Sequence, residues 1–262
     1  MVEVDFAQLQ QWLIAFFWPF VRLTAFLAAS PLWGHDSIPM RAKIGLAALL
    51  AVLVGPTLPP LPAVPLVSWS SLGIVIEQMA IGIAMGLTMR VVFAVVQAAG
   101  EIIGLQMGLG FATFFAPDTG TNTMILSRLL YMISLLMLLA FDGHLLVLEI
   151  LIASFTSLPI GQALDPAAGI SLVRYASAIL ASGLLLALPL VAALLTINLA
   201  MGILNRASPQ LTVFAVGFPL TLTVGLVLLM VLMNDLGRFL EGLFGGGLLF
   251  LRQFVDSLAL GS

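Results

Sequence analysis

Two long apolar runs separated by one polar corner constrain the fold of this chain more than any other feature. No Asp, Glu, Lys or Arg occurs from Tyr175 to Asn205 or from Ala207 to Asn234. Each run exceeds the roughly 20 apolar residues with which a helix crosses a hydrocarbon core about 30 Å thick. The polar corner between them contains Arg206 and Pro209, and proline favours a turn there. The runs are therefore predicted to form a helical hairpin built for an apolar solvent or for the interior of a helical assembly.

The composition extends this prediction to the whole chain. Of 262 residues, 61% are hydrophobic and only 8% are charged, and the mean hydropathy is +1.20. A soluble domain carries about 25% charged residues, so this chain could not cover a surface that faces water. It shows no sustained period-2 alternation, which a membrane β-barrel would need. We expect an all-α fold, a membrane-associated bundle of long helical hairpins.

Several classes of function are disfavoured by what the sequence lacks. The net charge of −3 argues against nucleic acid as a partner, because phosphate binding needs clustered Lys and Arg. The absence of cysteine excludes disulfides and thiolate catalysis. No His-Glu-x-x-His zinc motif, Gly-x-Ser-x-Gly nucleophile elbow or Gly-Lys-Ser/Thr phosphate loop occurs. We expect no enzymatic activity, no cofactor and no metal.

Glycine, proline and polar residues divide the chain into predicted helices. These run from about Leu9 to Ser30, Met40 to Val54, Trp69 to Met107, Asn122 to Leu158, Ile170 to Asn205 and Pro209 to Asn234. The fourth is expected to be interrupted near Asp142-Gly143-His144, and five prolines between positions 56 and 65 predict an extended connection. A short amphipathic tail, broken at Gly245-Gly246-Gly247, is expected to follow the last helix.

Glycines recur at helical spacing in the third predicted helix. They are Gly82 and Gly86, and then Gly100, Gly104 and Gly108. Small residues four positions apart let helix backbones approach closely in an apolar medium. The spacing alone leaves open whether they pack against other helices of this chain or against other subunits.

Four charged residues lie within or beside the apolar helices: Glu77, Arg90, Glu101 and Arg128. An ionised side chain in hydrocarbon costs at least a few kcal/mol unless it is paired or hydrated. They could mark a proton or ion pathway. We favour the alternative that they line a watered channel or form pairs between helices.

The segment Gly108 to Gly120 is apolar and aromatic but rich in helix breakers. Non-helical backbone at membrane depth survives only where protein or a water-filled cavity satisfies its polar groups. Phe111, Phe114 and Phe115 could form an apolar constriction, and such constrictions close pores by excluding water. The alternative is a buried re-entrant loop with packed phenylalanines. His144, close to Asp142, is interpreted as a structural residue rather than a catalytic one.

Three segments resemble the FliR family of flagellar export proteins, which includes the corresponding proteins of virulence type III secretion systems. The most specific is Asn198 to Leu211, with Asn205, Arg206, Pro209 and Gln210 at the hairpin turn, followed by Gly217-Phe218-Pro219-Leu220. The segment Gln106 to Pro117 is similar to the plug loop of that family. The segment Phe141 to His144 is similar to a third element, which often has Asn where this chain has Asp142.

The resemblance, which covers nearly the whole chain, implies a single export-gate domain over residues 1–262. Its first part, about 1–168, would be FliP-like and contain the plug loop 106–120, and its second part, about 169–262, would be a FliQ-like hairpin. Such a protein assembles with FliP and FliQ into a pore for unfolded flagellar proteins, contacts FlhB and FlhA as well as membrane lipid, and resides in the flagellar basal body at the bacterial inner membrane. The resemblance also assigns the plug to Met107, Phe111, Phe114 and Phe115.

Two other functions compete with the export gate. A secondary transporter for small solutes would place polar residues at broken helices, but the main break here is apolar and no inverted repeat is evident. An intramembrane enzyme is disfavoured by the absent motifs. Flagellar and virulence systems are harder to separate, although the hairpin motif resembles the flagellar form.

Overall fold

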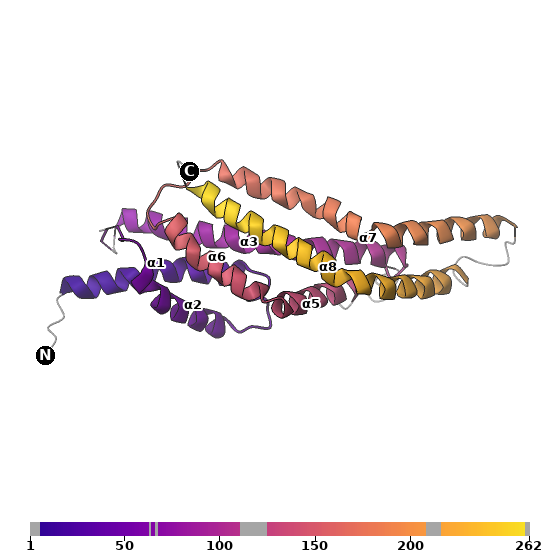
Figure 1. Cartoon of the computed structure of the whole chain (residues 1–262), viewed down its shortest axis with the longest axis horizontal. Coiled ribbons are helices and arrows are strands. Elements are labelled where there is room, and N and C mark those ends of the chain that lie inside the picture. Colours follow the sequence, from indigo (N-terminus) through magenta and orange to yellow (C-terminus); the bar gives the residue numbers. More distant parts are fainter. Residues whose placement is uncertain (1–5, 63, 66–67, 111–124, 208–215, 260–262) are drawn as a thin grey trace. The chain divides into compact units, whose positions relative to one another are not determined.

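The computed structural model describes residues 6–62, 64–65, 68–110, 125–207 and 216–259 (Figure 1). The described residues form seven α-helices and one short 3-10 helix, η1, at Gly55–Thr57. The α-helices are α1 (Phe6–Ala29), α2 (Met40–Val54), α3 (Trp69–Gln106), α5 (Ile125–Ala140), α6 (Gly143–Ser157), α7 (Ala168–Ala207) and α8 (Phe218–Leu258). The all-α class predicted from composition is confirmed.

Helix boundaries follow the predicted punctuation closely where glycine or proline supplies it. Helix α2 begins directly after Pro39 and ends before Gly55. The predicted interruption near Asp142 is confirmed, because α5 ends at Ala140 and α6 begins at Gly143. Asp142 takes a left-handed conformation, with φ of 54°, which turns the chain between the two helices. The proline-rich connection starts with the 3-10 turn, and the described residues between that turn and Ser68 are not helical.

The predicted break at Gly245-Gly246-Gly247 is wrong. Helix α8 continues through the three glycines and ends at Leu258. Each glycine disfavours helix by about 1 kcal/mol relative to alanine. Buried apolar side chains on both sides, among them Phe244 and Leu251, outweigh that local preference. A helix whose stability comes mainly from packing tolerates residues that would end an isolated helix.

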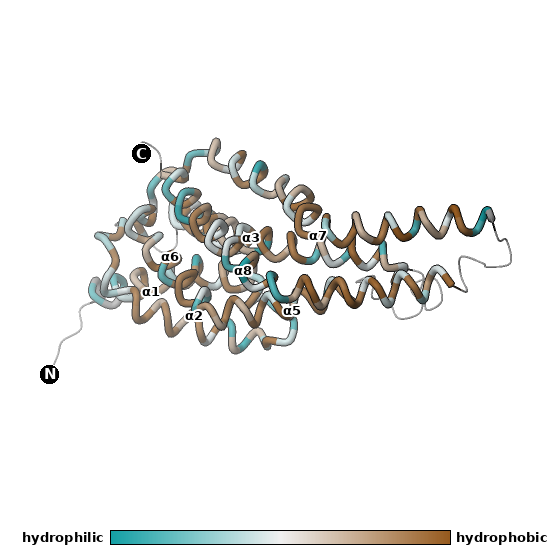
Figure 2. The backbone as a smooth tube through the Cα atoms, turned by 45° about the vertical axis from the view of Figure 1, so that its right-hand side comes forward, coloured by the Kyte–Doolittle hydropathy of each residue, from teal (hydrophilic) through white to brown (hydrophobic). Residues whose placement is uncertain are grey.

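The chain divides into two compact units, and unit 1 comprises Met1–Val91, Asp142–Ala176 and Gly245–Ser262. Within it, α1 and α2 lie side by side (Figures 1 and 2). One apolar core joins α1, α2, the first half of α3, α6 and the end of α8. Its largest fully buried side chains include Trp18, Phe26 and Phe155. Three distant stretches of sequence therefore build one core.

Unit 2 comprises Val92–Phe141 and Ser177–Phe244. The second half of α3 contacts each of the other helices of this unit. Phe93 of α3 packs against Tyr131 of α5 and Phe244 of α8, with ring centroids 5.6 and 5.7 Å apart. The hydroxyl of Ser127 donates a hydrogen bond to the carbonyl oxygen of Gln97 across 3.0 Å. The second half of α3 is thus the central element of unit 2.

Five of the described helical segments are long and apolar enough to cross a membrane: Gln10–Ala29, Met40–Thr57, Trp69–Gln106, Ala168–Arg206 and Phe218–Leu258. Helices α5 and α6 supply a sixth candidate if the broken pair is taken as one span. Apolar residues dominate these helices (Figure 2). The helices therefore have the length and composition of membrane-type elements.

Candidate functional site

The segment Gly108 to Gly120, which was interpreted from the sequence as a candidate apolar constriction and is called the gate segment, begins where α3 ends. The amide of Leu109 donates to the carbonyl oxygen of Gly104 across 2.9 Å, and the amide of Gly108 donates to that of Leu105 across 3.0 Å. Gly108 has φ of 82°. This pair of bonds with a left-handed glycine is a Schellman motif, which ends a helix and satisfies its last carbonyls. Gly108 therefore lies beyond the end of α3. The prediction that it shares a helix face with Gly100 and Gly104 is wrong.

Replacing Gly108 with Ala is expected to weaken this helix end. An L-residue in the left-handed region costs roughly 1–2 kcal/mol, so the free energy of unfolding should fall by about that amount. Gly202→Ala is a matched control, because nothing lies within 4 Å of a Cβ added at Gly202 in α7. Thermal unfolding of the purified chain in mild detergent measures both. Equal stability of the two variants would show that the conformation at Gly108 carries no strain for alanine.

Met107, the first residue assigned to the plug, is buried within unit 2. Its side chain lies against Gly225 of α8, and a Cβ added at Gly225 would come within 2.6 Å of the Met107 Cγ. The chain directly before the gate segment thus packs on α8, where Gly225 has no side chain and leaves room for that of Met107. Phe111, Phe114 and Phe115 lie outside the described residues.

Three of the spaced glycines lie at close helix contacts within the chain. Gly82 and Gly86 pack against α1, where added Cβ atoms would come within 2.8 Å of Ala25 Cβ and 2.6 Å of Ala29 Cβ. A Cβ on Gly100 would lie 2.6 Å from the Cα of Ser127 in α5. Gly104 is buried and its carbonyl takes part in the helix end described above. Of the two interpretations of the spacing, these contacts are of the intrachain kind.

The charged residues singled out from the sequence are not buried by this chain. Arg90, Glu101 and Arg128 are exposed, and Glu77 is half-buried. Any burial or pairing of Arg90, Glu101 and Arg128 therefore has to come from outside the described residues of this chain, and that interpretation of these charges stays a prediction.

Arg22 was not predicted to be a site residue, yet among the described residues it is the charged side chain that the chain buries. It is 0% exposed and lies near the middle of α1. A lone arginine inside an otherwise apolar helix of 24 residues was the signal that could have identified it. Its partners could not be predicted because they lie on α3 and α6, far away in sequence.

The remaining predicted residues occupy two chain corners. Asn205 is half-buried and Arg206 is exposed in the last turn of α7. Pro209 and Gln210 lie outside the described residues. At the other corner, the Nδ1 of His144 is buried and has no hydrogen-bond partner among the residues that the structure describes. His144 is half-buried in the first turn of α6, next to the turn at Asp142.

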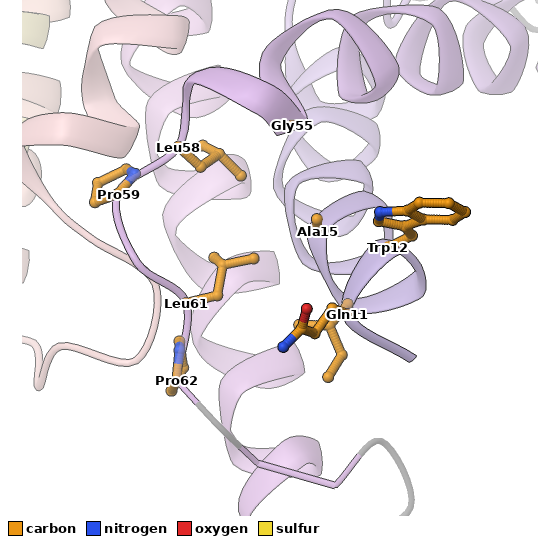
Figure 3. A pocket seen from close by; sticks show the side chains of 9 residues that line it. Gln11, Trp12, Ala15, Gly55, Leu58, Pro59, Leu61 and Pro62 are labelled. Atoms are coloured by element: carbon orange, nitrogen blue, oxygen red, sulfur yellow. The ribbon is translucent and has the colours of Figure 1, made fainter. Parts of the chain in front are cut away.

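An apolar pocket of about 360 Å³ lies between α1 and the segment that follows α2 (Figure 3). Its lining consists of Gln11, Trp12, Ile14, Ala15, Gly55, Leu58, Pro59, Leu61 and Pro62. None of these side chains can serve as an acid, a base or a strong nucleophile. Within the described part of the chain, no group of three or more His, Cys, Asp or Glu is placed to hold a metal ion. This pocket has the chemistry of a packing groove rather than of a reaction site.

One family model and several known proteins match this chain over most of its length. The family model described as bacterial export proteins, family 1, matches residues 13–247. The chain is 44% identical to the flagellar biosynthetic protein FliR of Escherichia coli K12 over 261 residues, which cover 99% of this chain and 100% of that protein. It is 46% identical to FliR of Pectobacterium carotovorum over 89% of each chain. It is 32% identical to FliR of Bacillus subtilis over 84% of this chain and 86% of that one.

The long apolar helices and the matching model define a bacterial export protein of the membrane type. The chain belongs to the FliR family of flagellar biosynthetic proteins, as the resemblance of its hairpin turn predicted.

Proposed function

We propose that this protein is a subunit of the flagellar export gate, which assembles with FliP and FliQ into the pore that unfolded flagellar proteins use to cross the inner membrane. The near-complete match to flagellar biosynthetic proteins carries this proposal. FlhB and FlhA are the further partners, and the chain acts without catalysis. The proposed division into a FliP-like part, about 1–168, and a FliQ-like hairpin, about 169–262, follows the family resemblance.

The uncovered apolar surface of the two longest helices supports assembly with other subunits. In the apolar 18-residue stretch of α3, 61% of the residues are buried within the chain. In the corresponding stretches of α7 and α8, only 28% and 22% are buried. Leu199 and Ile203 of α7 and Met230 of α8 expose 68%, 64% and 71% of their surface. Apolar area of this extent needs lipid or another protein to cover it. Neighbouring helices of a hetero-oligomeric pore would provide that cover.

The exposed charges fit the same proposal. Arg90 and Glu101 of α3 and Arg128 of α5 lie on membrane-type helices without burial by the chain itself. Charged groups on such helices usually face a watered cavity or pair with groups from neighbouring helices. In the proposed assembly they would pair with other subunits or line the channel.

The plug belongs to the segment that starts at the Schellman motif. Met107 anchors its first residue on α8, and Gly108 turns the chain away from the axis of α3. Phe111, Phe114 and Phe115 then follow within eight residues of the anchor. An anchored start and an aromatic sequence suit an apolar constriction that excludes water and ions from a resting channel.

Affinity purification of this chain in mild detergent, after expression with its genomic neighbours, tests the assembly by native mass spectrometry. We expect a discrete complex that contains one copy of this chain with several FliP-like and FliQ-like chains. A variant with Arg206 and Asn205 exchanged for alanine keeps the helices but alters the corner, so it reports how strongly the turn contributes.

A stable monomer or homodimer, purified despite the presence of those neighbours, would contradict the export-gate proposal. Solute uptake by vesicles that contain this chain alone would then favour the secondary transporter. The two outcomes differ in both the mass of the purified particle and its transport activity, so the two measurements separate them.

A further inference from the structure

The charged side chain of Arg22 is buried away from solvent. Its side chain is 0% exposed, and it lies in α1 among the apolar residues of unit 1. A buried guanidinium is costly unless its N–H groups are all hydrogen-bonded and its charge is compensated. The question is therefore which groups accept its hydrogen bonds and compensate its charge.

Every acceptor that surrounds the guanidinium is uncharged. The Nε donates to the Oε1 of Gln78 in α3 across 2.7 Å. The Nη1 donates to the carbonyl oxygen and to the Oγ of Ser154, at 3.0 and 3.1 Å. The Nη2 donates to the carbonyl oxygen of Leu158 across 3.0 Å. Gln78, Ser154 and Leu158 are themselves buried, with 1%, 1% and 0% of their surface exposed.

The end of α6 supplies the compensation that a carboxylate would otherwise provide. Helix α6 ends at Ser157, and the last carbonyls of a helix lack partners within it and carry about half a negative charge. Arg22 binds the carbonyl oxygens of Ser154 and Leu158 at this end, and that of Ser154 also accepts the amide of Leu158 across 3.0 Å. Its Cζ also lies 4.3 Å from the centroid of the Phe155 ring, on the negative face of the aromatic system. The hydroxyl of Ser154 donates to Leu151 O across 2.6 Å, which leaves its lone pairs for Arg22.

The segment held by Arg22 leads directly to the end of α8. Beyond Leu158, the connection between α6 and α7 passes next to the last residues of α8. The amide of Asp165 donates to the carbonyl oxygen of Leu258 across 3.0 Å, and Leu164 forms an antiparallel bridge with Ala259. Val255, in the last turn but one of α8, is 2% exposed in the same core. The connection that follows α6 is therefore hydrogen-bonded to the end of α8.

We propose that Arg22 is a positioning residue: its guanidinium holds the carboxyl end of α6 and, through the connection 158–165, the end of α8. The planar fork is required because its three nitrogens donate to acceptors on three separate residues, which the single nitrogen of lysine cannot reproduce. The proposal concerns unit 1 alone and stands whether or not the chain assembles into an export gate.

A single-cysteine reporter tests this arrangement in the full chain, because the natural sequence contains no cysteine. Val255→Cys places a thiol in the core at the end of α8, and its alkylation rate by a maleimide in mild detergent reports the opening of that end. Ala187→Cys is the matched control, since Ala187 is 0% exposed but belongs to unit 2. Rates are expressed relative to the same chain after complete unfolding.

Arg22→Met, Arg22→Lys and Gln78→Glu are then compared on both reporters. Arg22→Met keeps roughly the side-chain volume but leaves the buried acceptors without a hydrogen-bond donor. We expect alkylation at position 255 to become at least about tenfold faster, while position 187 stays protected. Arg22→Lys should restore only part of the protection. Gln78→Glu should remain protected, because a carboxylate there accepts the hydrogen bond of the Arg22 Nε and lies next to its positive charge.

The combination of Arg22→Met with Gln78→Glu is the decisive variant. It buries a carboxylate without a cation, so position 255 should react faster than in either single variant. A pure packing role predicts instead that Arg22→Met is as protected as the natural chain and that Gln78→Glu is the disruptive change. That result, or equal acceleration at positions 187 and 255, would overturn the proposal.

Discussion

Deletion of residues 110–116 is expected to make the assembled pore leak small ions. The deletion removes Phe111, Phe114 and Phe115, the side chains proposed to exclude water from the resting channel. It leaves Met107 and Gly108, so the end of α3 and its contact with Gly225 are retained. Conductance of the purified complex in a planar bilayer should rise from the background of the intact complex to resolved open events.

Two substitution sets separate the apolar character of the plug from its mere presence. Exchange of the three phenylalanines for leucine keeps an apolar constriction and should keep the complex closed. Exchange for serine keeps the loop length but admits water, and should produce leakage like that of the deletion. If the deletion left conductance unchanged, the segment would not be the barrier, and the alternative of a buried loop with packed phenylalanines would be favoured.

Gly82→Ala is expected to destabilise unit 1 by about 1–3 kcal/mol, the usual cost of overpacking a close contact. A Cβ at this position would lie 2.8 Å from Ala25 Cβ and 2.9 Å from the backbone nitrogen of Phe26. The obstacle includes backbone of α1, which no side-chain rotation can remove. Denaturant unfolding in mild detergent, followed by circular dichroism, measures the change.

Gly73→Ala is the control on the same helix, with the same atoms added. Nothing lies within 4 Å of a Cβ at Gly73, so the change should be neutral or stabilise α3 by up to about 1 kcal/mol, the propensity difference between glycine and alanine. A loss of stability that is the same for both variants would mean that the contact between α1 and α3 does not depend on the missing side chain.

Much of the helical framework could be predicted because its signals are local. Pro39 and Gly55 flank α2 and set both of its ends, and Asp142 marks the turn between α5 and α6. Local signals failed where packing competes with them. The three glycines at positions 245–247 disfavour helix, yet α8 continues because buried side chains lie on either side of them.

Residues whose role depends on distant partners could not be placed from sequence. Arg22 and Arg90 have the same chemistry and both lie in apolar helices, but one is fully buried and the other is exposed. The difference comes from the end of α6, which lies more than a hundred residues after Arg22 in the sequence. The sequence around either arginine therefore does not indicate which of the two is buried. Gly108 shows the opposite case, since its spacing suggested a helix face but its backbone conformation ends the helix.

The core of unit 1 joins the first helix of the chain to the last. Ile14 and Trp18 of α1 share this core with Leu251 and Phe254 of α8. Since a ribosome delivers α1 first, that helix emerges while one wall of its binding site has yet to be translated, and it must meanwhile be accommodated by lipid or by a chaperone. A product of premature termination before residue 245 keeps this apolar surface open, which is what quality-control proteases recognise. The core of unit 1 can therefore close only after the last turns of α8 have been translated.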